Sequence, residues 1–341
     1  MNRIRLSAAA SSIAVAVLFV ALLLPASCRS ATREGKLVYG LTLAPSTIDP
    51  HVGASSELGI PLTSVYDPLV WLFPGGQFVP GLAESWEVSE DGKVYILELR
   101  QDVKFHDGTA LNAAAVCYNL ERIVDPGTKS AKAIGLLGPF EGCQAIDEHT
   151  AEVSFSTPHA PFMSAVSQVY LAIASPAALA KWGDEYQFHQ VGTGPFKFKE
   201  YVPKDHLTLV RNEDYDWAPS FFEHQGPAYL TEIEFRFYGD AATRAPALES
   251  GEVDVMGEIP PADAARLEAD EGFQLLAVPV PGEPLQMHVN TARAPTDDLR
   301  VRQALIYAAD RQAIVDAVFM GTSPPAYGPL NRVTWSYDCL L

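Results

Sequence analysis

Basic residues are scarce in this sequence. It has 24 lysines and arginines against 42 aspartates and glutamates, which gives a formal net charge of −18. Because phosphate binding needs a basic footprint, this balance argues against a nucleic-acid partner. No acidic run is long enough to indicate a disordered tail, and 48% of the residues are hydrophobic. That share is enough for a packed core and for more than one domain.

The usual signatures of enzymes and metal sites are also missing. The eight histidines are scattered, and neither HExxH, CxxC nor G-x-S-x-G occurs. The stretch GTGPFK (192–197) resembles a phosphate loop but lacks the GK[ST] ending and opens a strand. The adjacent His106 and Asp107 of KFHDGTAL have no partner set nearby. We therefore expect no catalytic residue, metal or cofactor, with Asp107 a turn residue and His106 a partly exposed residue at a strand end.

The longest apolar run lies near the N-terminus, at residues 14–26, with two arginines before it and small residues and Cys28 after it. This order is typical of a secretory signal, and the run is short for a membrane span. A cysteine in this place resembles a bacterial lipobox, although Pro25 stands where that pattern prefers leucine. We expect a signal peptide at 1–27, export to the periplasmic side of the cell envelope and a lipid anchor at Cys28. Ordinary cleavage nearby is the alternative.

Cysteines are few as well, four in all. Export makes disulfides possible, and no Cys/His spacing in the chain suggests zinc. Cys117 falls beside the apolar stripe of a predicted helix, and Cys143 opens a predicted strand. We favour a disulfide between these two residues. Two buried free thiols are the alternative.

Hydrophobic periodicity predicts a mixed α/β chain. Asn112 is a suitable N-cap for a helix over 113–124, which Asp125-Pro126 would end. The remaining predicted elements are a strand near 36–43, hairpins at 85–100, 143–155 and 193–216, a strand–helix–strand unit at 230–257, an extended segment at 284–290, and helices at about 298–309 and 311–320. No repeat of 20–50 residues is visible.

Seven segments, taken together and in order, carry a family resemblance. They are IDPH (48–51), GLAESWEVSEDGKVYILELRQDVKFHDGTALNAAAVCYNLER (81–122), GTGPFKF (192–198), RNEDYD (211–216), SGEVDV (250–255), DDLRVRQALIYAADRQAIVDAVFMG (297–321) and AYGPL (326–330). As a set they resemble the extracellular solute-binding proteins of family 5. These are the dipeptide- and oligopeptide-binding components of ABC importers.

The resemblance implies an α/β fold of the periplasmic-binding-protein type, a two-lobed type II clamp with an extra inserted subdomain. The first lobe would comprise 36–80 and 190–275, and the inserted subdomain would comprise 81–189. Residues 276–341 would form the truncated start of the second lobe. Family chains continue well beyond the segment that matches AYGPL. We therefore expect an incomplete second lobe here, and weak ligand binding or none.

The resemblance implies a binding function without catalysis. The chain would be the substrate-binding component of an ABC importer, which captures peptides or similar small solutes between its lobes and delivers them to a membrane permease. Its expected partners are the solute and the ABC permease subunits, and we expect a monomer. The alternative is a clamp-type receptor domain for signalling or adhesion, without transport.

The resemblance also implies three ligand-facing segments. Their residues are Gly53, Ala54, Ser55 and Ser56, then Met256, Gly257, Glu258 and Ile259, and finally His288. Main-chain groups of the first segment can pair with an extended peptide, whereas a plain surface loop is the alternative. Glu258 is expected either to hold a cationic ligand group or to be solvated. For His288 the alternative is a packed strand histidine.

Overall fold

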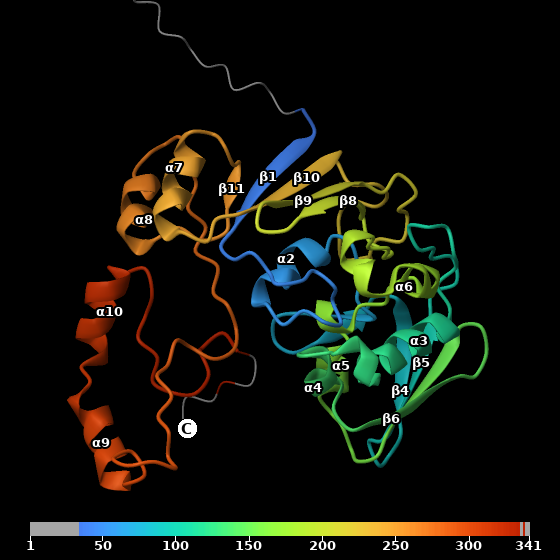
Figure 1. The fold of residues 1–341 in the computed structure, drawn as a ribbon, viewed down its shortest axis with the longest axis horizontal. Coiled ribbons are helices and arrows are strands. Elements are labelled where there is room, and N and C mark those ends of the chain that lie inside the picture. The colour runs from blue at the N-terminus through green and yellow to red at the C-terminus, as the bar shows by residue number, and fades with distance from the viewer. Residues whose placement is uncertain (1–33, 335–336, 338–341) are drawn as a thin grey trace, which may run out of the picture. The chain divides into compact units, whose positions relative to one another are not determined.

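The computed structural model describes residues 34–334 and 337. The predicted signal peptide (1–27) and Cys28 lie outside the described residues. The described chain mixes strands and helices, as predicted (Figure 1). Its three sheets have five, two and four strands.

The five-stranded sheet has the order β11-β1-β10-β9-β8. Its strands are β1 (Lys36–Leu41), β8 (Phe196–Val202), β9 (His206–Arg211), β10 (Glu232–Phe237) and β11 (Val255–Met256). β1 pairs in parallel with β10 on one side and β11 on the other, while β10, β9 and β8 are antiparallel. The carboxyl ends of β1, β10 and β11 therefore meet at one edge of this sheet.

Helix α7 (Arg244–Glu249) connects β10 to β11 and covers part of this sheet. Its Ala247 packs with Val38 of β1 and with Val253 in a small cluster of buried side chains. Gly251 follows the helix with φ +71°, a conformation that favours glycine. The strand–helix–strand unit predicted at 230–257 is thus confirmed.

The four-stranded sheet has the order β4-β5-β7-β6 and is antiparallel. Its strands are β4 (Ala83–Val88), β5 (Val94–Leu99), β6 (Phe140–Ala145) and β7 (Thr150–Phe155). Helix α3 (Ala113–Val124) packs beside it through buried residues that include Val116, Leu120 and Ile123. The Asn112 side chain accepts a hydrogen bond from the amide of Ala115 at 2.8 Å, which satisfies a free donor at the helix start.

The other elements are short. They are the hairpin β2 (Val70–Leu72) and β3 (Phe78–Pro80), the α-helices α2 (Gly59–Leu62), α4 (Ala133–Leu137), α5 (Phe162–Ala165), α6 (Pro176–Trp182) and α8 (Pro261–Glu268), and the 3-10 helices Ser56–Leu58, Pro126–Thr128, Val169–Leu171, Gly183–Phe188 and Ala241–Thr243. One hydrophobic core runs from β1 through the four-stranded sheet. The segment 81–189, called the inserted segment below, shares that core, and its separation as a subdomain stays a prediction.

The KFHDGTAL stretch forms a corner of this core. The carboxylate of Asp107 accepts hydrogen bonds from the Thr109 amide at 3.0 Å and the Ser175 hydroxyl at 2.5 Å. The His106 ring donates through Nε2 to the Gly194 carbonyl at 2.9 Å and accepts at Nδ1 from the Gly192 amide at 3.3 Å. His106 therefore joins this corner to the GTG stretch at 192–194.

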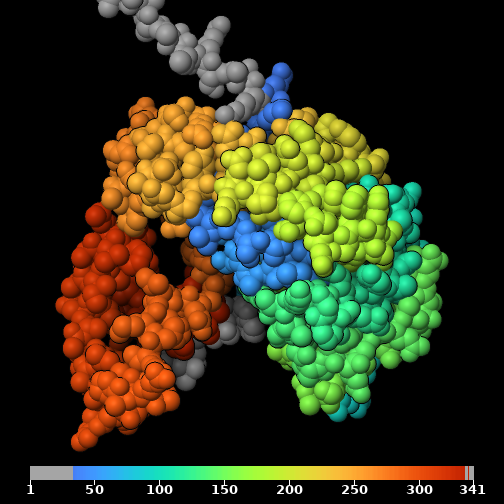
Figure 2. All heavy atoms as spheres, in the orientation of Figure 1, coloured from blue at the N-terminus to red at the C-terminus, as the bar shows by residue number. Residues whose placement is uncertain are grey.

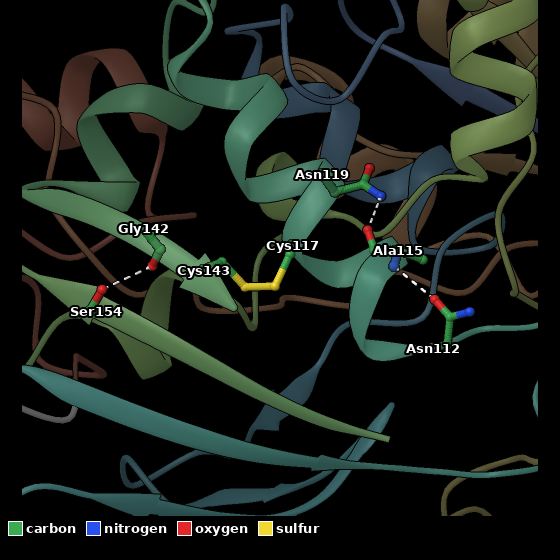
Figure 3. The surroundings of a disulfide bond; sticks show 7 residues. All are labelled: Asn112, Ala115, Cys117, Asn119, Gly142, Cys143 and Ser154. Carbon is green, nitrogen blue, oxygen red and sulfur yellow. Dashed lines mark hydrogen bonds between the residues drawn. A yellow bond between two sulfur atoms is a disulfide. The ribbon is translucent and has the colours of Figure 1, made fainter. Parts of the chain in front are cut away.

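The structure contains the disulfide that the sequence favours (Figure 3). Cys117 of α3 and Cys143 of β6 are joined with an S–S distance of 2.02 Å and a Cα–Cα distance of 5.1 Å. The bond closes a loop with a sequence separation of 26. It links the helix covalently to an edge strand of the four-stranded sheet.

Replacing Cys117 and Cys143 by serine together is expected to lower the free energy of unfolding by about 3 kcal/mol, because the open loop regains chain entropy in the unfolded state. Urea unfolding of the oxidised protein measures this. Reductant should shift the midpoint of the parent protein and leave that of the variant unchanged, which separates the loss of the crosslink from any change in packing. Alkylation of Cys117 and Cys143 in the untreated protein, mapped by mass spectrometry, would contradict the prediction.

The segment from 276 to 334 has two longer helices, α9 (Leu299–Ala308) and α10 (Arg311–Phe319), close to their predicted bounds. Neither helix has a buried residue, and Leu285 and Tyr307 are each 87% exposed. The segment from 276 to 334 is coloured orange to red in Figure 2. The extended segment predicted at 284–290 forms no strand, because no described strand lies beside it to share main-chain hydrogen bonds. Within 34–334 no helix combines the length and apolarity needed to cross a membrane.

Candidate ligand-binding site

The two longer predicted ligand-facing segments follow neighbouring parallel strands. Gly40 of β1 lies opposite Met256 of β11, and the Gly257 amide donates to the Gly40 carbonyl at 2.9 Å. The chain after β1 and the chain after β11 therefore leave the sheet at the same edge. In open α/β sheets, ligands bind in the crevice outside the carboxyl ends of the strands.

Tyr39 and Glu57 lie between these two segments. The Glu57 carboxylate accepts a hydrogen bond from the Thr42 amide at 3.3 Å. Burial raises the pKa of Tyr39, and the charge of Glu57 raises it further. A Cβ atom on Gly257 would lie 3.1 Å from the Tyr39 hydroxyl and 3.2 Å from the Gly40 carbonyl oxygen. A side chain at position 257 would therefore require its neighbours to shift by a few tenths of an ångström, so glycine suits this close approach of the Tyr39 phenol to the loop.

Glu258 faces an arginine in this structure. Its carboxylate is 3.7 Å from Nη1 of Arg244, with the Glu258 side chain 67% exposed and the Arg244 side chain 10% exposed. Nε of Arg244 donates to the Tyr238 carbonyl at 3.1 Å. Neither expectation from the sequence, a contact with a cationic ligand group or a solvated side chain, included Arg244 as a partner of Glu258. The edge of the sheet thus presents a nearly buried guanidinium and an exposed carboxylate side by side.

The first predicted segment is an exposed loop with a buried base. Gly53 is buried, and a Cβ atom there would collide with the Leu58 side chain. The Ser55 hydroxyl accepts a hydrogen bond from the Glu57 amide at 3.3 Å, and the Ser55 carbonyl accepts one from the hydroxyl of Tyr170 at 2.7 Å. Ala54 and Ser56 are exposed. The loop is therefore anchored through Gly53 and the Ser55 carbonyl, while Ala54 and Ser56 face solvent.

A buried polar group precedes this loop. Arg122 of α3 donates to both carboxylate oxygens of Asp49, at 3.2 and 2.7 Å, and to Nδ1 of His51 at 2.8 Å. Nε2 of His51 donates to the Ala172 carbonyl at 2.8 Å. Burial lowers the pKa of His51 to about 4, with opposing contributions from Asp49 and Arg122. The ring is therefore neutral at pH 7, with its proton on Nε2.

Sequence reasoning missed Arg122, Tyr170 and Arg244. The only available signal was the IDPH motif itself, whose Asp49 and His51 are polar residues that burial would force to find partners. The partners lie far away in the sequence, so the motif could not name them.

The remaining predicted residues are not drawn together by described contacts. Ile259 is half-buried and continues the loop after β11. His288 is exposed, and no described hydrogen bond or ion pair joins it to either loop. Its contact with ligand stays a prediction. The described residues contain no group of three or more histidine, cysteine, aspartate or glutamate side chains placed to hold a metal ion.

A hollow of about 400 Å³ lies elsewhere, on the outer face of β8, β9 and β10. Its charged side chains pair with one another, as in the contacts of Glu232 with Lys199 at 2.8 Å and of Arg236 with Glu234 at 2.6 Å. This hollow contains none of the predicted ligand-facing residues. Because its charges already have partners, we interpret it as a solvated, ion-paired surface.

Comparison with known proteins identifies the family. The model of bacterial extracellular solute-binding proteins, family 5 (middle), matches residues 77–339. The chain is 34% identical over 329 residues to the glutathione-binding protein GsiB of Escherichia coli O1:K1, covering 94% of this chain and 62% of that protein. It is 32% identical over 309 residues to GsiB of Pectobacterium atrosepticum, covering 90% and 58%.

Solved structures agree with this result. The binding protein AgaA of A. tumefaciens R10, in complex with agropinic acid, is 35% identical and superposes with a TM-score of 0.70 over 84% of this chain and 56% of that one. DppA of Helicobacter pylori, in complex with the peptide STSA, has a TM-score of 0.73 over 89% and 62%. At 24% identity this second likeness shows the fold alone.

The fold and these relatives place the chain in the periplasmic-binding-protein fold class. The chain belongs to family 5 of the bacterial extracellular solute-binding proteins. Members of this family are binding proteins rather than enzymes. The chain spans 62% of the length of the E. coli relative that it matches.

Proposed function

We propose that this chain is the substrate-binding component of an ABC importer, which captures a peptide or similar small solute between two lobes and delivers it to a membrane permease. The observation that supports the proposal is the parallel pairing of β1 with β11 in a family-5 chain, because the segments that follow these two strands leave the sheet at one edge and lead to the loops proposed at 53–56 and 256–259. We also propose that His288 contacts the solute. The lobe bounds and the lipid anchor at Cys28 are proposed as the sequence predicts them.

The charges at this edge favour a solute that carries both an ammonium and a carboxylate group. Glu57 and Glu258 offer carboxylates, while Arg244 and the Tyr39 hydroxyl offer donors. A guanidinium pairs with a carboxylate through two parallel hydrogen bonds. Glutathione has both kinds of group, and it is named as the ligand of the curated relatives. We therefore propose glutathione or a short peptide of similar charge as the first solute to test.

Isothermal titration with glutathione tests this proposal on two proteins. One is the chain without its leader. The other is extended after Leu330 by the remaining segment of the E. coli relative. We expect the unextended chain to bind more weakly than about 1 mM and the extended protein to bind at micromolar concentrations, because contacts from two lobes add. No binding of glutathione or of a mixed di- to hexapeptide pool by the extended protein would overturn the proposal.

Within the extended protein, Glu258→Gln is expected to weaken glutathione binding at least fivefold, because the side chain loses the charge that attracts an ammonium group. Glu90→Gln, on the exposed β4–β5 turn, is the matched control and should leave the affinity unchanged. Equal affinities of the two variants would exclude Glu258 from the site. Neighbouring genes for two permeases and two ATPases would favour import over a receptor role.

A further inference from the structure

Arg244 is the only arginine among the buried residues of the described chain, with 8% of its surface exposed. Its guanidinium makes one described hydrogen bond, in which Nε donates to the Tyr238 carbonyl at 3.1 Å. Glu258 is its ionic partner, but the 3.7 Å from Nη1 to the Glu258 carboxylate is too long for a hydrogen bond. Within 34–334, Nη1 and Nη2 of Arg244 therefore have no hydrogen-bond acceptor.

A buried guanidinium with so few acceptors is unusual, because a charge that leaves water needs new partners. Arg122 of the inserted segment has them. Its side chain is 16% exposed, and it donates to both carboxylate oxygens of Asp49 and to the ring of His51. The Arg244 side chain is 10% exposed and has only the Tyr238 carbonyl. The contrast indicates that the acceptor for Arg244 comes from outside the described residues.

The free end of this guanidinium lies at the proposed solute site. Nη1 is beside Glu258, in the loop that follows β11. Neither Nη1 nor Nη2 is among the described polar atoms that are buried without a partner, so both nitrogens keep some contact with solvent. The loop leaves the sheet at the carboxyl edge of the parallel strands β1, β10 and β11. A solute at that edge can therefore reach the two nitrogens.

Opposite charges held side by side match one particular chemical group. A free α-amino-acid group carries its ammonium and its carboxylate on one carbon, through bonds of about 1.5 Å each. Its carboxylate can accept two parallel hydrogen bonds from Nη1 and Nη2 of Arg244, while its ammonium donates to the exposed carboxylate of Glu258. The two ends of an ordinary peptide cannot bind in this way, because they lie about 10 Å apart in an extended tripeptide.

We propose that Arg244 and Glu258 together bind a free α-amino-acid group of the solute, with Arg244 holding its carboxylate and Glu258 its ammonium. This inference rests on the proposed function, because it takes the loop at 256–259 to contact solute. It also narrows the class of solute. Peptides joined through a γ-glutamyl bond, such as glutathione, have a free α-amino-acid group, whereas peptides joined only through α-carboxyl groups do not.

Two isomeric tripeptides test this inference. Glutathione and its α-linked isomer Glu-Cys-Gly have the same atoms and the same charged groups, and they differ only in which glutamate carboxyl forms the peptide bond. In isothermal titration of the extended protein, glutathione is expected to bind about tenfold more tightly than the isomer, because only glutathione satisfies both members of the buried pair.

Arg244→Gln should reduce this affinity ratio to about one, since the contact that distinguishes the isomers is then lost. The matched control is Arg236→Gln, which removes the ion pair with Glu234 on the outer face of the sheet and should leave the ratio unchanged. A folding defect weakens both isomers alike, so the ratio reports the contact alone.

Equal affinities of the two isomers for the parent protein, or an unchanged ratio in Arg244→Gln, would overturn the inference. The proposed function would survive either result, because the extended protein would still bind a peptide. If the extended protein bound neither isomer and none of the mixed peptide pool, the proposed function and this inference would both be wrong.

Discussion

Replacing Arg122 with methionine is expected to lower the free energy of unfolding by about 3 to 5 kcal/mol. The Asp49 carboxylate is 5% exposed and takes both of its charge-assisted hydrogen bonds from this guanidinium. Without it, a negative charge stays buried with no cation, and Nδ1 of His51 loses its donor. The penalty comes chiefly from the partner left behind, because removing one member of a buried pair costs more than the pair contributes.

Urea unfolding at pH 7 measures this loss. Lys197→Met is the control, because its ion pair with Asp214 is 3.1 Å long but leaves the Asp214 side chain 82% exposed. An exposed pair of this kind contributes less than about 1 kcal/mol. Adding Asp49→Asn to Arg122→Met should recover part of the stability, since the buried charge is then gone. The prediction is wrong if Arg122→Met costs no more than the control.

Elements with local signals could be predicted from the sequence. The helix predicted at 113–124 matches α3, because its cap, its apolar stripe and its terminating Asp-Pro all lie within a few residues of one another. The hairpin β2–β3 was missed. Its two three-residue strands are separated by the stretch Phe-Pro-Gly-Gly-Gln, and strands of that length carry too little alternation to be recognised.

The candidate site also has a part that the sequence could predict and a part that it could not. The loops at 53–56 and 256–259 could be proposed from the sequence because they adjoin recognisable motifs. The contacts that hold the first loop join residues far apart in the chain, 73 positions for Arg122 with Asp49 and 115 for Tyr170 with Ser55. Such pairs arise from tertiary packing. A single sequence gives no local pattern for them, even though the burial of a polar motif requires that partners exist.

Acid is expected to destabilise the protein between about pH 6.5 and pH 4 through the buried His51 and the half-buried His106. Burial lowers the pKa of His51 to about 4 and that of His106 to about 4. Both rings are held neutral, with Nε2 donating to a carbonyl and Nδ1 accepting from an N–H group. Asp49 and Arg122 face His51, and Lys197 and Asp107 act on His106.

The sign follows from which state binds protons more strongly. Below its ordinary pKa of 6.5, an unfolded histidine is protonated while the folded one is still neutral, so proton binding stabilises the unfolded state and the free energy of unfolding decreases as the pH falls. Each ring should cost about 3 kcal/mol by pH 4. His206 acts in the opposite sense, because its carboxylate neighbours outweigh burial and raise its pKa. Its stabilising contribution is therefore full below pH 6.5 and is lost only as the pH rises above that value.

The slope of unfolding free energy against pH separates these contributions from any packing defect of a variant. In the parent protein it should approach two protons between pH 6 and pH 4.5, or about 2.7 kcal/mol per pH unit. His51→Gln and His106→Gln should each remove about half of it, whatever their stability at pH 7. A parent slope near zero would mean that the rings are not held neutral. In that case Arg122 could not be donating to His51, and the polar group that supports the ligand loop would have to be arranged differently.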